Sequence, residues 1–185
     1  MPMCFRLDKQ AVVKERWRYN MDSKKLTLGL FIFYLIVLIW IIVFKLQFSF
    51  RDLPELRSIN IIPFGQSRTT NGIISYSEII NNTMAFIPFG VLINVLRENK
   101  SFIKKVFPIV MTSLLFEVIQ FIFGIGASDI TDIIANSLGG VIGILISCVI
   151  SKIFYNNWKK IVNIVSLIGG TILTLFVGIL ILANL

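Results

Sequence analysis

Histidine is absent from this chain of 185 residues, and only two cysteines are present. The absence of histidine excludes a Ser-His-Asp triad, a Cys-His pair, an HExxH motif and any metal site with a histidine ligand. Cys4 stands in the polar N-terminal part and Cys148 within an apolar run, so no disulfide framework is indicated. Any chemistry must therefore use carboxylate, amide, hydroxyl or amine groups.

Charged residues are also scarce, at 15% of the chain against 56% hydrophobic residues, with a mean hydropathy of +0.83. This apolar content exceeds what a soluble domain of the same size can bury. The net charge of +8 does not indicate a nucleic-acid partner, because the basic residues stand before and between apolar runs. The sequence predicts an all-α, polytopic helix bundle in a bacterial cytoplasmic membrane.

Five apolar runs approach the roughly 20 residues that a helix needs to cross a bilayer. The first follows Lys24 and Lys25 and has no small-residue cleavage site, so it is interpreted as an uncleaved anchor. We expect a basic cytosolic segment at residues 1–25, one membrane domain at 26–185, and an outer segment at 47–78. The predicted spans are 27–46, 79–96, 106–126, 130–151 and 161–183.

Lysine and arginine are concentrated before the first run and in the connections 97–105 and 151–160. Residues 126–129 and the end of the chain carry none. Because cytoplasmic loops hold the excess of basic residues, the N-terminus is predicted inside and the C-terminus outside. The outer segment contains prolines and glycines and is expected to fold back over the outer face.

Polar residues in the third run are predicted to lie deep in the membrane. Glu117 lies 12 residues after Lys105, which at 1.5 Å per residue places it about 18 Å into a core about 30 Å thick. Gln120 shares its helical face because it is three residues further on. Both side chains are therefore expected in the outer half of the membrane.

The neighbouring runs carry matching polar positions. Asp129, Asp132 and Asn136 have the spacing i, i+3, i+7, which places them on one face of the fourth helix. Asn82 lies four residues after Glu78, where the second helix enters from the outside. The three helices are thus predicted to bring polar groups into one outer layer.

Carboxylates in hydrocarbon are costly unless they pair or reach water, so Glu117 and Asp132 are functional candidates. The alternative for the amides of Asn82, Gln120 and Asn136 is a structural role as hydrogen bonds between helices. Arginines of the outer segment, among them Arg68, could neutralise the acids and bind phosphate or carboxylate groups. A solvated loop position is the alternative for these arginines.

Two glycine patterns predict close helix packing. Gly139 and Gly143 are four residues apart in the fourth run, which lets another backbone approach and would hold the polar face still. Gly170, Thr174 and Gly178 have the same spacing in the fifth run.

The residues laid out above resemble the VanZ family of glycopeptide-resistant Gram-positive bacteria. The likeness spans nearly the whole chain after about residue 27. It is carried by the segments Leu38-Ile-Trp-Ile-Ile-Val-Phe-Lys-Leu-Gln47, Asn60-Ile-Ile-Pro-Phe64, Asn82-Thr-Met-Ala-Phe-Ile-Pro-Phe-Gly90, Phe116-Glu-Val-Ile-Gln-Phe-Ile-Phe123 and Ile125-Gly-Ala-Ser-Asp-Ile-Thr-Asp-Ile-Ile-Ala-Asn-Ser-Leu-Gly-Gly140.

The family pattern falls largely on the positions that the depth argument selects. One departure is that many members have an arginine shortly before the acidic pair, where this chain has Gly124-Ile-Gly-Ala-Ser128. Together, spacing and resemblance give one set of candidate ligand-binding residues. They are Asn60, Arg68, Asn82, Glu117, Gln120, Asp129, Asp132 and Asn136.

The resemblance implies reduced susceptibility to teicoplanin, a lipid-tailed glycopeptide that binds the D-Ala-D-Ala ends of cell-wall precursors. The leading hypothesis is a non-catalytic protein whose outer polar pocket engages the acyl portion of the antibiotic or a lipid-linked cell-wall precursor. Besides membrane lipid, these are the expected partners. No cofactor and no oligomeric state are indicated.

Two other functions remain open at this point. A membrane enzyme would use Glu117, Asp129 and Asp132 as acid, base or ligands of a divalent cation such as Mg²⁺ on a lipid-linked envelope substrate. A non-catalytic regulator of another envelope protein would use the polar layer only for helix packing.

Overall fold

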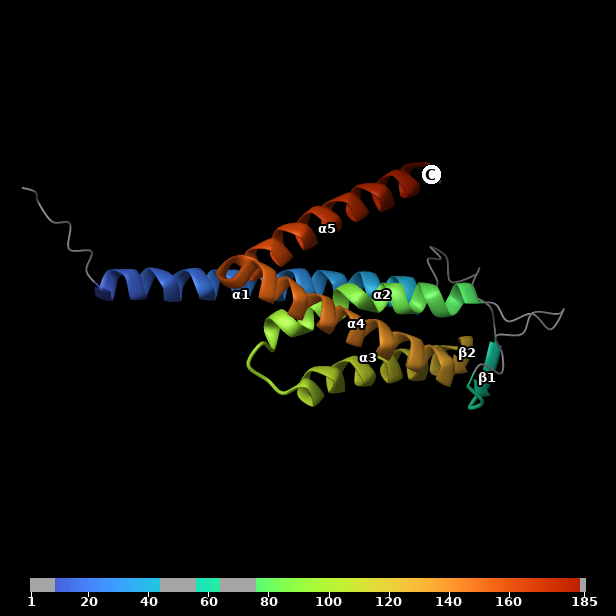
Figure 1. Ribbon diagram of the computed structural model, residues 1–185. Coiled ribbons are helices and arrows are strands. Elements are labelled where there is room, and N and C mark those ends of the chain that lie inside the picture. Colours follow the sequence, from blue (N-terminus) through green and yellow to red (C-terminus); the bar gives the residue numbers. More distant parts are fainter. Residues whose placement is uncertain (1–8, 44–55, 64–75, 184–185) are drawn as a thin grey trace, which may run out of the picture.

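The computed structural model describes residues 9–43, 56–63 and 76–183. These residues form five α-helices, two short strands and one turn of 3₁₀-helix (Figure 1). The elements are α1 (Lys9–Ile42), β1 (Leu56–Asn60), α2 (Tyr76–Leu96), α3 (Phe102–Phe123), β2 (Ile125–Asp129), α4 (Ile130–Phe154), η2 (Tyr155–Asn157) and α5 (Trp158–Ala183).

Helices long and apolar enough to cross a membrane confirm the predicted all-α membrane bundle. Within the described ranges there are four such stretches, and the last, Ile130–Ile179, takes in both α4 and α5. The break between these two helices lies at Tyr155, which has a positive φ of 43°. Helices of 25 and 26 residues can each span a core about 30 Å thick, so the predicted number of about five corresponds to the separate helices.

The bounds of two helices differ from the prediction. Helix α1 begins well before residue 27, because Lys24 and Lys25 are good helix formers and continue the helix, and it ends at Ile42. Helix α3 ends at Phe123 rather than at residue 126. Gly124 adopts a left-handed conformation with φ 67°, and its N–H bonds to carbonyls of the last turn, which closes the helix.

A parallel pair of strands, which the sequence did not predict, joins the outer segment to the α3–α4 connection. Strand β1 pairs with β2 in a register that sets Leu56 opposite Ile125 and Asn60 opposite Asp129. The end of the bundle with these strands, where α2 and α4 begin and α3 ends, is called the strand end below. The other end, where α2 ends and α3 begins, is called the loop end.

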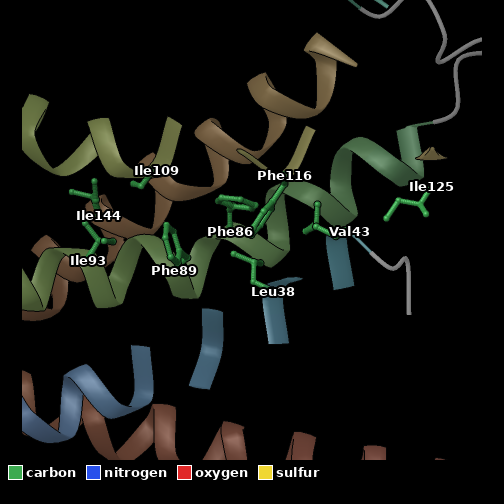
Figure 2. Packing of buried hydrophobic residues seen from close by; sticks show 10 residues of the cluster. Leu38, Val43, Phe86, Phe89, Ile93, Ile109, Phe116, Ile125 and Ile144 are labelled. Carbon is green, nitrogen blue, oxygen red and sulfur yellow. The ribbon is translucent and has the colours of Figure 1, made fainter. Parts of the chain in front are cut away.

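The core lies among α1, α2, α3 and α4 and is rich in phenylalanine (Figure 2). The Phe86 ring stands edge-on to Phe89 and Phe116, with centroid distances of 5.6 and 6.1 Å. The Tyr34 hydroxyl donates to the Ala85 carbonyl over 2.6 Å and ties α1 to α2. These contacts fix the position of Phe116 in α3, and with it the position of the next residue, Glu117.

Glycines bring α2 and α4 into backbone contact, as predicted from the Gly139 and Gly143 spacing. A Cβ built on Gly139 would overlap the Thr83 carbonyl oxygen, and one on Gly143 would overlap the Ile87 carbonyl oxygen. Gly90 of α2 meets the backbone of α4 in the same way. The start of α4 is therefore held rigidly against α2.

The glycines of α5 behave differently. A Cβ on Gly170 would meet only the Phe33 ring, and one on Gly178 would meet nothing within 4 Å. Helix α5 diverges from the other four, as Figure 1 shows. Close packing along this stripe is thus limited to Gly170.

Candidate functional site

The predicted meeting of the polar faces of the third and fourth runs is confirmed at the strand end. The Glu117 side chain is only 4% exposed, and its Oε2 atom accepts a hydrogen bond of 2.9 Å from the backbone N–H of Asp129. The Ser128 hydroxyl donates to the Glu117 carbonyl over 2.8 Å. Glu117 therefore joins the last turns of α3 to the end of β2.

Asp129 links three elements. Its Oδ1 atom accepts from the Thr131 N–H over 2.8 Å and caps the N-terminus of α4. Its Oδ2 atom accepts from the Asn60 amide over 3.0 Å, across the strand pair. The side-chain oxygen of Asn60, Oδ1, accepts in turn from the Ile62 N–H over 3.1 Å. This carboxylate is fixed as a hydrogen-bond acceptor.

Asp132 and Asn136 lie further along the buried face of α4. Asp132 stands in the first turn, where the helix dipole favours a carboxylate. Asn136 is fully buried and donates to the Ser113 hydroxyl over 2.9 Å. Its side-chain oxygen is buried without a hydrogen-bond donor in the described part of the chain.

Sequence reasoning missed Ser113, although it lies four residues before Glu117. That spacing places the two residues on one helical face and could have identified Ser113. A serine in an apolar helix is common, so its type alone gives no signal.

Gln120 and Asn82 are the remaining amides that were predicted for the polar layer. The Gln120 amide donates to the carbonyl of Ile42, the last residue of α1, over 3.0 Å. The Gln120 side-chain oxygen is buried and has no donor among the described residues. Asn82 is buried next to Thr83, whose hydroxyl donates to the Ala135 carbonyl over 3.2 Å. The amide interactions between helices agree with the structural alternative for Gln120.

The structure does not describe the arginine side chains that were predicted to neutralise the acids. Arg68 and Arg51 lie outside the described residues, and of Arg57 only the backbone is placed, opposite Gly126. A role for these arginines stays a prediction.

A groove of about 300 Å³ opens beside this polar layer, between β1 and α3, and is called the site groove below. Its walls are apolar and include Leu114 and Val118 of α3 and Ile133 of α4. Glu117 and Asp129 contribute to its lining, together with Asn60. The accessible surface of the site groove is therefore hydrocarbon-like, and the polar atoms of Glu117, Asp129 and Asn60 lie behind it in hydrogen bonds within the protein.

The described residues contain no group of three or more carboxylate or cysteine side chains that could hold a metal ion. The divalent cation of the enzyme hypothesis therefore stays a prediction without a ligand set in this part of the chain.

A second polar cluster, which sequence reasoning missed, lies at the loop end. The Asn94 amide donates to the Ser147 hydroxyl over 3.0 Å, and the Lys105 ammonium donates to the Asn94 oxygen over 2.8 Å. Asn163 of α5 lies 2.8 Å from the hydroxyl of Thr27 of α1. Single asparagines within apolar runs are the signal that could have identified this cluster.

Fold and site define a helical membrane protein with a buried acidic and amide-rich layer beside an apolar groove at one end of its bundle. The VanZ/LLP1 family model matches residues 31–154, from the middle of α1 to the end of α4. The chain is also 40% identical over 155 residues to Protein VanZ of Enterococcus faecium, which covers 83% of this chain and 91% of that relative. The chain therefore belongs to the VanZ/LLP1 family, and the resemblance drawn from its sequence is confirmed. No solved structure matches it.

Proposed function

We propose that this protein lowers susceptibility to teicoplanin by engaging a lipid-linked ligand in the site groove. Family membership supports the resistance function, and the residues of the groove lie within or beside the matched segment. The observation that carries the mechanism is the apolar groove itself, which opens along the lipid-exposed Leu114 and Val118 beside the buried Glu117. A soluble ligand would not need such walls, whereas a lipid-linked one would place its hydrocarbon against them.

The proposal places the protein in the bacterial cytoplasmic membrane as a multi-pass protein, with its N-terminus in the cytosol and its C-terminus outside. Arg97, Lys104 and Lys105 stand at the loop end, and Lys24 and Lys25 lie just before the apolar part of α1. The ion pair between Lys159 and Glu98 lies at the same end. By the positive-inside tendency the loop end faces the cytosol, so the site groove faces the outer leaflet.

In this orientation the ligand's hydrocarbon lies along Leu114, Val118 and Ile133, in contact with the lipid phase. Its polar part lies beyond the groove, at the strand end. Both teicoplanin, through its acyl portion, and a lipid-linked cell-wall precursor combine hydrocarbon with a polar part.

A second candidate function is regulation of another envelope protein. It is favoured by the hydrogen bonds that the polar residues form among themselves. The Asn60 amide donates to Asp129, and both side chains accept from backbone N–H groups, which is the pattern of a structural brace. Substitution Asp132→Asn discriminates the two functions. A regulator keeps full resistance with a neutral amide at position 132 as long as the fold survives, whereas a ligand site that uses the Asp132 carboxylate loses resistance.

Binding to the purified full-length chain in nanodiscs tests the proposal. Teicoplanin or the lipid-linked precursor should bind above the level of empty nanodiscs, and vancomycin, which lacks the acyl tail, tests whether that tail is needed for binding. The groove variant is Leu114→Trp, and the matched control is Leu115→Trp, because both leucines are lipid-exposed but only Leu114 lines the groove. Failure of both ligands to exceed the empty discs would refute ligand engagement.

A further inference from the structure

A second and larger cavity, of about 560 Å³, lies where α5 leaves the bundle, and is called the α5 cavity below. Helices α1, α2, α4 and α5 all contribute to it, with Leu30, Pro88, Ile150 and Gly169 among the lining residues. In Figure 1 the red end of α5 points away from the other helices. The cavity is separate from the site groove, since the two share no lining residue.

The base of α5 is firmly attached, so the cavity is a built feature of the fold. Trp158 and Val162 are buried against Leu30, Leu92 and Val95. The contact of Asn163 with α1 adds a buried hydrogen bond at the same level. Beyond Gly170, most of the large apolar side chains of α5 are exposed, among them Ile172, Leu175 and Phe176, which leaves the upper part of the helix apart from the bundle.

Water is a poor occupant for the α5 cavity. The side-chain hydroxyls of Tyr34 and Ser166 are the polar side-chain groups in its lining, and the Tyr34 hydroxyl already donates to Ala85. A buried water usually needs two to four polar partners. An unfilled space of this size would forfeit the dispersion contacts of the surrounding side chains. Hydrocarbon chains of membrane lipids supply the dispersion contacts that these apolar walls lack.

Charge at the attached end of α5 indicates which lipid supplies the hydrocarbon. Lys24 and Lys25 are exposed on α1 just before the cavity residue Leu30, and exposed Lys160 directly precedes the cavity residue Ile161. Lys159 is engaged with Glu98. Basic residues at a membrane surface attract anionic headgroups.

We propose that the α5 cavity is a binding site for an anionic phospholipid, with one acyl chain between α5 and the bundle and the phosphate near Lys24, Lys25 and Lys160. The lipid thus fills the α5 cavity, which the side chains of the protein leave empty. This inference goes beyond the proposed function, because it concerns another site at the opposite membrane face.

Two glycines of α5 provide a matched pair of variants. A Cβ on Gly169 and a Cβ on Gly178 would both meet nothing within 4 Å, so a side chain has space at either position. Only Gly169 lines the cavity. Gly169→Leu therefore fills the acyl-chain position, and Gly178→Leu adds the same bulk to α5 elsewhere.

The test purifies the full-length wild type and both variants from membranes of mixed phosphatidylglycerol and phosphatidylcholine and measures retained lipid by native mass spectrometry. Wild type and Gly178→Leu should retain phosphatidylglycerol, and Gly169→Leu should lose it while keeping its helicity. Equal retention by Gly169→Leu would overturn the site, and retention of phosphatidylcholine at the level of phosphatidylglycerol would overturn the anionic specificity. A lipid-free dimeric mass for the wild type would also overturn the proposal, because a second copy would then cover α5.

Discussion

Substitution Gly139→Ala should destabilise the protein, because the added Cβ would overlap the Thr83 carbonyl oxygen of α2. Alanine favours a helix over glycine by about 1 kcal/mol. Overpacking costs roughly 1–3 kcal/mol, and the high end applies here because a backbone carbonyl cannot rotate away. Separation of the helices would also weaken the bond from Thr83 to Ala135, at about 0.6 kcal/mol in a membrane protein. The net loss is on the order of 1–3 kcal/mol.

Thermal unfolding in detergent micelles measures this effect, with Gly29→Ala as the control, because a Cβ on Gly29 meets nothing within 4 Å. A loss of about 2 kcal/mol lowers the midpoint by roughly 4–8 °C in a chain of this length. Gly29→Ala should leave the midpoint unchanged or raise it slightly. If Gly139→Ala unfolds at or above the temperature of Gly29→Ala, the backbone contact between α2 and α4 is not as described.

Three further outcomes follow from the site and the fold. Ser113→Ala should cost about 0.5–2 kcal/mol in the same assay, because it leaves the buried Asn136 amide without its acceptor, and a double-mutant cycle with Asn136→Ala should show the coupling. Asp129→Ala should lower the free energy of unfolding by about 1–2 kcal/mol, because it removes the α4 cap. Asp129→Asn keeps a capping oxygen and should lower it less. A larger loss for Asp129→Asn than for Asp129→Ala would contradict the capping role. A C-terminal alkaline phosphatase fusion should be active in cells and a C-terminal green fluorescent protein fusion dark; the reverse pattern would show that the strand end faces the cytosol.

The parts of the site that sequence reasoning predicted are those governed by helical spacing. The faces of Glu117 and of Asp129 meet across the α3–α4 connection, because a fixed rise and period place their polar positions at one level. The glycine contact at Gly139 was predictable for a similar reason, since small residues one turn apart allow a backbone to approach.

The parts that were missed depend on pairing between distant segments. Strands of five residues, β1 and β2, give too short a pattern for periodicity, and their parallel pairing joins residues far apart in sequence. The same holds for the hydrogen bond between Thr27 and Asn163, which lies in no sequence motif. The divergence of α5 could not be predicted, because its stripe of small residues is also the pattern of a helix that packs closely against others.

The most direct test of the central claim is the teicoplanin susceptibility of cells that express the wild type, Leu114→Trp or Leu115→Trp at equal membrane abundance. Tryptophan at position 114 fills the site groove, whereas the same side chain at position 115 faces lipid outside it. The account predicts that resistance is lost with Leu114→Trp and kept with Leu115→Trp. Full resistance with Leu114→Trp would contradict it.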